Sequence, residues 1–293
     1  MPPHRSIAVV ATAALSLVSA AASPAHAETF LWRVQGEDHA LFLGGTLHVL
    51  GEDDYPLPEA FDVAYEEADA LVLETDLAAL AAPEGQQAML DALTYDAGTT
   101  IFDALGDATD ERLEAHLVER GLPVEAFAAF RPGLLLSALT IVELQRLGVA
   151  AEGVDAHYQG RAIADGKALV ELEPVEAQID MLAALGEDDA EELVRWTLDD
   201  MDRMGELMAS MTEAWRAGEP GEIERIVVAP MAERMPQDHD ALLTDRNRDW
   251  LPRIEAMLGT EEIELVLVGA AHLVGEEGLL AALEAAGYEL EQL

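Results

Sequence analysis

The chain has 293 residues, of which 58 are acidic and 16 are basic, so its formal net charge is −42. Such a charge repels nucleic acids and anionic lipid surfaces and attracts cations, so we expect no nucleic-acid partner. The chain has no cysteine, which excludes disulfides and the acylated cysteine of a lipoprotein. Its length suits one large domain with an inserted subdomain. Most of the acidic residues are typical of a solvated surface and do not by themselves identify a site.

The first 27 residues have the features of a secretory signal peptide. Arg5 gives a basic start, an apolar run covers 7–22, and an A-x-A cleavage pattern ends at Ala27. The run is shorter and richer in alanine than a membrane-spanning helix of roughly 20 strongly apolar residues. We therefore predict export, cleavage after residue 27, and a mature chain in the periplasm or outside the cell. No stable insertion in the membrane is expected after cleavage.

The first part of the mature chain alternates strands and a helix. Residues 30–35 and 40–45 are apolar and flank the turn GEDH, which predicts an opening hairpin. Residues 56–70 have the 3.6-residue spacing of a helix, and 71–77 (LVLETDL) predict a buried strand. Strand, loop, helix and strand in this order are typical of a parallel sheet, whose ligands bind at the carboxyl ends of the strands.

The middle of the chain is mostly helical. Residues 168–174 (ALVELEP) predict a further buried strand, and a helix follows it. Helical insertions are expected over about 83–166 and 186–258 within a single domain, 28–293.

A long amphipathic segment, 187–218, carries an apolar stripe. The stripe is formed by Met201, Met204, Met208, Met211 and Trp215, which recur at spacings of three and four. The stripe has two possible interpretations: a seam of the core, or an adaptable groove for an apolar peptide or lipid.

The two ends of the chain share one pattern. Residues 41–52 read LFLGGTLHVLGE and residues 265–276 read LVLVGAAHLVGE, so that aligning Gly45 with Gly269 superposes two G-x-x-H motifs. Each motif follows an apolar strand and precedes a helix and a strand. We therefore predict an α/β (α+β) fold, with a central mixed sheet built from two similar strand-loop-helix units and a largely helical insertion.

The histidines of these motifs, His48 and His272, are candidate metal ligands. Glycine allows the backbone to turn sharply and to approach a ligand closely, while the strand fixes the direction of the histidine side chain. If the two strands are neighbours, the imidazoles converge, and imidazoles beside carboxylates commonly hold a divalent transition metal. A single G-x-x-H is a weak signal, and one such histidine is more often a hydrogen-bonded structural residue.

Carboxylates are available at the exits of two predicted strands. Glu74 follows LVL, and Glu173 lies near the end of ALVELEP. A glutamate in a run this apolar needs a partner, because burial of an unpaired charge is costly. Each glutamate has the alternative of facing water or capping the next helix. Asp76 and Glu171 are lower-ranked substitutes.

Four further polar residues are secondary site candidates or candidates for binding the substrate. We interpret Asp155 as the cap of the helix that follows it, and His157 as a residue of that helix that points toward the cleft. Arg246 and Asn247 form a polar pair in a helix with an apolar face. Arg246 either balances charge or, near a metal, binds a substrate carboxylate or stabilises an oxyanion. A Gly-rich phosphate loop, H-E-x-x-H and G-x-S-x-G do not occur.

In their order and spacing these motifs resemble the TraB, PrgY and GumN family, which is related to the Tiki metalloproteases and more distantly to the erythromycin esterase and ChaN-like group. The resemblance covers essentially the whole mature chain. It implies paired strand-helix units around a metal cleft and metal-dependent cleavage of peptide bonds, with manganese, cobalt or zinc. The family's functional residues fall on Gly45, His48, Glu74, Glu173, Arg246, Asn247, Gly269 and His272.

The leading hypothesis is a secreted metal-dependent hydrolase that acts on a peptide or protein. Both histidines and one glutamate, Glu74 or Glu173, hold the cation, and the other glutamate takes a proton from bound water. Arg246 and Asn247 position the substrate or the developing oxyanion. The alternative is a non-catalytic envelope protein that binds a peptide, haem or metal. A structural role in envelope or exopolysaccharide assembly is a third hypothesis.

Overall fold

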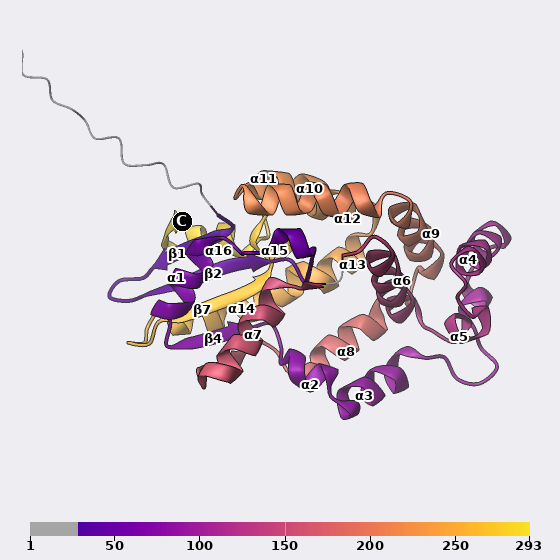
Figure 1. The fold of residues 1–293 in the computed structure, drawn as a ribbon, viewed down its shortest axis with the longest axis horizontal. Helices are drawn as coiled ribbons and strands as arrows, with labels where there is room; N and C mark the ends of the chain where they lie inside the picture. The colour runs from indigo at the N-terminus through magenta and orange to yellow at the C-terminus, as the bar shows by residue number, and fades with distance from the viewer. Residues whose placement is uncertain (1–28, 150) are drawn as a thin grey trace, which may run out of the picture.

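The computed structural model describes residues 29–149 and 151–293, shown as a ribbon in Figure 1. The predicted signal peptide, residues 1–27, lies outside the described residues. Within the described ranges, no helix is long and apolar enough to cross a lipid bilayer.

A six-stranded mixed sheet forms one side of the molecule, on the left in Figure 1. Its order is β6-β4-β7-β2-β1-β8, and β6, β4, β7 and β2 run parallel, while β1 is antiparallel to both of its neighbours. This confirms the predicted fold class with a central mixed sheet. The strands are β1 (Leu31–Gln35), β2 (Ala40–Thr46), β4 (Ala70–Leu73), β6 (Ala168–Glu171), β7 (Glu264–Gly269) and β8 (Glu289–Gln292).

The strands that precede the two G-x-x-H motifs are neighbours. β2 and β7 pair in parallel, with Gly45 beside Val268 and Thr46 beside Gly269. β1 and β2 form the expected hairpin, whose turn is closed by the Gly36 N–H donating to the His39 carbonyl at 2.8 Å. The two units then diverge, because the first leads to β4 beside β7, whereas the second ends in β8 at the edge of the sheet.

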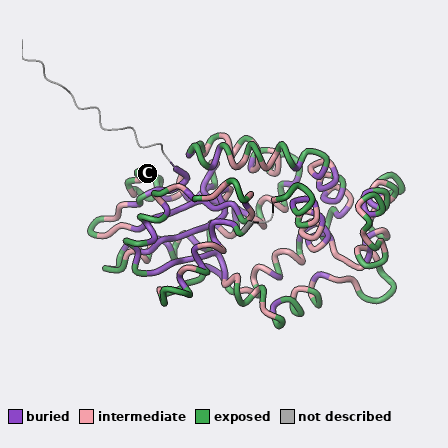
Figure 2. Tube along the Cα trace, viewed as in Figure 1, coloured by how far each residue is buried: buried purple, intermediate pink, exposed green. Residues whose placement is uncertain are grey.

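The main core lies between the sheet and the helices that cover it, where buried residues are concentrated in Figure 2. These helices contribute large buried side chains: Phe61 and Tyr65 from α1, Tyr158 from α7 and Trp250 from α14. Leucines of α16 complete this core. The helices are α1 (Glu59–Glu67), α7 (Val154–Asp165), α14 (Asp245–Met257) and α16 (Leu279–Ala286).

The helical half, on the right in Figure 1, has a second core of its own, which includes Leu113, Leu139 and Leu198. Its elements are α2 (Leu77–Ala81), α3 (Pro83–Leu93), η2 (Ile101–Ala104), α4 (Asp107–Glu119), α5 (Val124–Ala128), α6 (Pro132–Arg146), α8 (Val175–Ala184) and α9 (Ala190–Met201). The remaining elements are β3 (Val49–Leu50), η1 (Glu52–Asp54), β5 (Ala151–Glu152), α10 (Met204–Arg216), α11 (Pro220–Ile223), η3 (Glu224–Val228), α12 (Ala229–Arg234), α13 (Pro236–His239), η4 (Asp240–Thr244) and α15 (Ala270–Leu273).

The methionine stripe does not lie on one continuous helix. α9 ends at Met201 and α10 begins at Met204, and both methionines are buried in the second core. Met211 packs against the main core, and Trp215 is fully buried there. Most of the stripe is therefore a core seam that joins the two halves, while Met211 also lines a hollow beside the candidate site.

The prediction of a buried strand over 168–174 is wrong in one respect. β6 is an edge strand, and Leu169 and Val170 are 41% and 42% exposed. Its apolar residues match those of a central strand, and local sequence does not reveal how many neighbours a strand will have.

A buried ion cluster in the helical half gives a stability prediction. Glu143 is buried and accepts hydrogen bonds from Arg146 Nε and Arg120 Nε at 3.0 Å each. The bond from Arg146, with that from Arg120, outweighs burial and lowers the pKa of Glu143. Replacing Glu143 with glutamine leaves the mostly buried Arg120 without its main counter-charge. We expect the free energy of unfolding to fall by about 2 kcal/mol in urea denaturation at pH 7.

Because the pKa of Glu143 is lower in the folded state, its stabilising effect is present above its ordinary pKa of 4.5 and is lost as the pH falls through the folded-state value. The difference between parent and variant should therefore shrink in acid. Glu119→Gln is the control, since this carboxylate is 80% exposed and lies 3.5 Å from the same arginine. Equal destabilisation by both variants would contradict the prediction.

Candidate functional site

The candidate site lies at the carboxyl ends of the parallel strands. His48 follows β2 by two residues, Glu74 follows β4 directly, and Glu173 comes two residues after β6. β7 ends at Gly269, which is the N-cap of the short helix α15 that carries His272. His272 was expected in a loop like that of His48, so the two motifs differ in local structure. All of these residues meet at one edge of the sheet, where open α/β sheets bind ligands.

The His48 imidazole is oriented by Asp155. Its Nδ1 lies 2.6 Å from Asp155 Oδ2, and the carboxylate raises the pKa of His48 to about 9. The His48 side chain is 61% exposed, whereas Asp155 is buried. The interpretation of Asp155 as a helix cap is wrong, because Gly153 is the N-cap of α7 and the Asp155 side chain makes no capping bond.

His272 is buried and oriented by Asn247. Its Nδ1 lies 2.7 Å from Asn247 Oδ1, and Asn247 Nδ2 donates to the carbonyls of His272 and Glu277. These carbonyls fix the orientation of the amide, so the network assigns the proton to Nδ1 and a lone pair to Nε2. Burial lowers the pKa of His272 to about 3, so the imidazole is neutral near pH 7. Asn247 thus positions the histidine, and its side chain is not free for a substrate.

Glu74 is a buried, ionised carboxylate. Burial alone would raise its pKa, but the neighbouring histidines, Arg246 and a backbone hydrogen bond outweigh that effect and lower the pKa to about 2. Its Oε1 accepts from the Gly269 N–H at 2.6 Å, and its Oε2 accepts from Arg246 Nη2 at 2.6 Å. Oε1 also lies 3.8 Å from His272 Nε2.

Arg246 ties the two strand-end glutamates together. Its Nε and Nη2 donate to the two oxygens of Glu173 at 3.1 and 2.8 Å, and its Nη1 donates to His272 Nε2 at 3.1 Å. Trp250 Nε1 also donates to Glu173 Oε2, at 3.0 Å. Both oxygens of Glu173 are therefore engaged, and this carboxylate holds the guanidinium in place.

The histidines and Glu74 converge around Gly269. A Cβ atom placed on this glycine would lie 3.3 Å from Glu74 Oε1, 3.4 Å from His48 Nε2 and 3.6 Å from His272 Cδ2. Gly45, the equivalent residue of the first motif, has a different role: a Cβ atom there would lie 2.4 Å from the Phe30 ring. Gly269 leaves space between the three side chains of the candidate site, whereas Gly45 allows Phe30 to pack in the core.

Three lower-ranked candidates lie elsewhere. His157 packs against the rings of Tyr55 and Tyr158. Asp76 caps α2 by accepting from the N–H groups of Ala78 and Ala79. Glu171 is exposed on the edge strand β6. No contact brings any of these three into the cluster of described residues around Gly269.

The sequence reasoning missed three residues of the site. Trp250 stacks under Arg246, with the guanidinium carbon 4.5 Å from the ring centre, and its ring also packs on His272. Its position four residues after Arg246 places the two on one helix face, which was the available signal. Thr46 and Thr75 line the cleft with buried hydroxyls that have no hydrogen-bond partner among the described residues.

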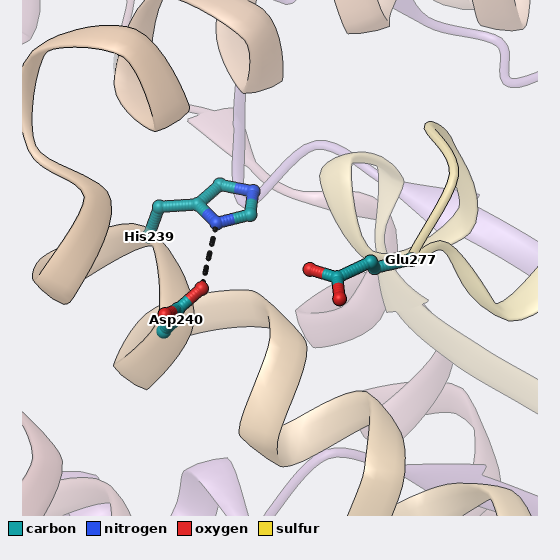
Figure 3. A group of neighbouring side chains, drawn as sticks. All are labelled: His239, Asp240 and Glu277. Atoms are coloured by element: carbon teal, nitrogen blue, oxygen red, sulfur yellow. Dashed lines mark hydrogen bonds and ion pairs between the residues drawn. The ribbon is translucent and has the colours of Figure 1, made fainter.

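A tighter group of ligand-type atoms lies nearby. Across 29–149 and 151–293, the one set of three His, Asp or Glu side chains whose candidate ligand atoms all lie within 4.8 Å of one another is His239, Asp240 and Glu277, shown in Figure 3. The atoms of His48, Glu74 and His272 are therefore spread more widely than this. Asp240 and Glu277 are exposed, and such groups are common in an acidic chain, so this set does not by itself identify a metal site.

Fold and site together define an α/β protein with a histidine-carboxylate cluster at the carboxyl ends of its parallel strands. The sequence profile of the TraB/PrgY/gumN family matches residues 30–292. The chain belongs to this family, as its motifs indicated.

Two relatives match across most of their length. An uncharacterised protein of Escherichia coli K12, YbaP, is 26% identical over 236 residues, which cover 80% of this chain and 84% of the relative. YbaP of Shigella flexneri is 26% identical over 245 residues, which cover 83% and 87%. No solved structure matches the chain.

Proposed function

We propose that this protein is an exported, metal-dependent hydrolase that cleaves peptide bonds, as the resemblance to the Tiki metalloproteases implies. One observation carries the proposal: His48, Glu74 and His272 surround Gly269 at the ends of adjacent parallel strands. The acidic surface is consistent with attraction of a cation or a basic peptide.

Two imidazoles and a carboxylate are ligand types that divalent metal ions prefer, and hydrogen bonds to both Nδ1 atoms orient the imidazole rings. Each histidine has its Nδ1 held by an oxygen, from Asp155 in one case and Asn247 in the other, which leaves Nε2 for the cleft. Metal-binding histidines commonly have this second hydrogen bond, because it fixes the tautomer and the ring direction. Glu74 adds an ionised carboxylate with Oε1 in the same space.

Glu74 suits the ligand role better than Glu173. Glu173 has both oxygens bound by Arg246 and Trp250, whereas Glu74 Oε1 has only the Gly269 N–H as a hydrogen-bond partner among the residues that the structure describes. Arg246 currently donates to His272 Nε2, so the guanidinium must release this atom when an ion is held. We propose that Glu173 then keeps Arg246 beside the cleft.

The remaining residues orient the site and balance its charge. A bound ion would supply an activated water and polarise a substrate carbonyl. Asp155 and Asn247 keep the two imidazoles in place. Arg246 stays positively charged beside Glu74 and can offset negative charge that develops on a substrate oxygen.

Metal analysis gives the direct test. Protein purified without chelator should contain about one equivalent of manganese, cobalt or zinc, because His48, Glu74 and His272 form one group of ligand-type side chains around Gly269. Removal of the ion by dialysis against a chelator should reduce cleavage of a peptide library to background, and one of the three ions should restore it. Metal content is measured by mass spectrometry and cleavage by chromatography.

His239→Ala is the matched control, since this histidine belongs to the other group of ligand-type residues and should not affect metal content or cleavage. Cleavage that survives complete removal of metal would overturn the proposal. Metal that binds without turnover of any peptide would favour the non-catalytic alternative instead.

A further inference from the structure

Two hollows meet at the candidate site. One, of about 220 Å³, is lined by Thr46, Thr75, Asp155 and Gln178 among others. The second, of about 250 Å³, is lined by Arg246, Ala270, Ala271 and His272 among others. Thr46, His48 and Glu74 lie in the walls of both. His48 and Glu74 therefore line both a first hollow of mixed polarity and a second hollow, which we call the apolar compartment.

The apolar compartment has a uniform wall. Apart from Thr46 and the charged or imidazole groups of the site itself, its lining is entirely apolar. The chain has 58 acidic residues, yet among the residues that the structure describes only Glu74 is an acidic residue of this lining. Part of its wall consists of Met211, Ile223, Val227, Met231, Leu242 and Leu243.

Two π-helical turns build part of this wall. η3 supplies Val227, and η4 supplies the adjacent leucines Leu242 and Leu243. A π turn adds a residue to the helical turn and changes which side chains face one side, and such turns occur frequently at functional sites. Here they direct apolar side chains toward the hollow beside His272 and Arg246.

The size of the compartment limits its occupant. Sites for whole small-molecule ligands typically have volumes of about 300–1,000 Å³. A hollow of about 250 Å³ is smaller and suits a single side chain. Acidic side chains are disfavoured by Glu74 in its lining and by the net charge of the chain.

We propose that the apolar compartment receives one aliphatic or aromatic side chain of the substrate, next to the bond that is cleaved. The substrate class is therefore a peptide with a large apolar residue at that position. This inference rests on the proposed function, because it places the bound side chain beside His48, Glu74 and His272. Met211 and Met231 are the two methionines of its lining, so their size should affect which side chain fits.

Substrate preference provides the first test. The parent protein is assayed with peptides that differ at one position only, carrying Gly, Ala, Leu, Phe, Trp or Asp. We expect kcat/KM for Leu or Phe to exceed that for Gly by at least about tenfold, since burial of each added methylene gives this order of discrimination. The double variant Met211→Ala/Met231→Ala should shift the preference toward Trp, and Met231→Trp should shift it toward Ala and Gly.

Met208→Ala is the matched control. Met208 lies on the same helix as Met211 but packs against the second core, outside the compartment. It should leave the order of preference unchanged. A uniform loss of activity with an unchanged order in the double variant would overturn the inference, because a general structural defect does not alter selectivity. An equal rate for Gly and Leu peptides in the parent would overturn it as well.

A binding measurement separates this inference from the proposed function. The methionine methyl groups are labelled with ¹³C, and their NMR signals are followed during titration with N-acetyl-leucinamide or N-acetyl-glycinamide. The leucine amide should shift the signals of Met211 and Met231 and leave that of Met208 unchanged, while the glycine amide should shift none. Shifts with no peptide cleavage would support the compartment and reject the hydrolase. No selective shift would overturn the inference even if cleavage is observed.

Discussion

Replacing His48 with alanine is expected to abolish metal uptake and peptide cleavage while the protein stays folded. The imidazole is 61% exposed and contributes little to the core, so the fold should persist, but the thermal unfolding temperature should fall because the buried Asp155 carboxylate loses its partner. Its Nε2 is one of the three donors around Gly269, and Asp155 would remain without a ring to orient. We expect kcat/KM to fall on the order of 1,000-fold, as for loss of a group that stabilises the transition state.

Metal content, circular dichroism and cleavage of a peptide library are measured on the same preparation of the variant. His157→Ala serves as the control. This substitution removes the same number of atoms, and His157 packs against two tyrosines outside the cluster. If His48→Ala cleaved the library as fast as the parent, the assignment of His48 would be wrong.

Gly269→Ala should inactivate the protein by filling the site. The backbone at Gly269 has φ −52° and ψ 137°, which alanine adopts without strain, so the fold should persist. The added methyl group would lie 3.3 Å from Glu74 Oε1 and 3.4 Å from His48 Nε2. An ion held at bonds of about 2.0–2.2 Å cannot share that space with a methyl group. We expect loss of bound metal and a fall in kcat/KM on the order of 1,000-fold.

Two other glycines make this experiment selective. Gly160→Ala, on α7, adds a methyl group to open space and should leave activity and stability close to those of the parent. Gly45→Ala should instead lower the stability, because its Cβ would lie 2.4 Å from the Phe30 ring and 3.0 Å from the Ala270 backbone. Full metal content in Gly269→Ala would show that the ion does not lie among these three side chains.

Strand patterns predicted that the candidate residues lie close together, because these patterns carry information on topology. The repeated strand and G-x-x-H pattern indicated that His48 and His272 follow similar strands, and β2 and β7 are adjacent and parallel. The apolar runs before Glu74 and near Glu173 likewise located strand ends. Parallel strands bring their carboxyl ends to one edge, so residue order along the chain was sufficient to place these groups near each other.

Partner choice was not predictable from local sequence. Asp155 has the position of a helix cap, yet its carboxylate contacts an imidazole that lies far away in the chain. The sequence likewise did not reveal that Glu173 binds Arg246 and Trp250, or that β6 lies at the edge of the sheet. These contacts depend on tertiary distances, which a local pattern of polar and apolar residues does not encode. The π turns η3 and η4 have no distinctive composition and were also missed.

The position of β7 has a consequence for the order of folding. This strand comes late in the chain, yet it is inserted between β4 and β2 in the middle of the sheet. A nascent polypeptide that lacks it would expose the open edges of two apolar strands, which are templates for aggregation. The sheet therefore closes only after nearly the whole chain has been synthesised.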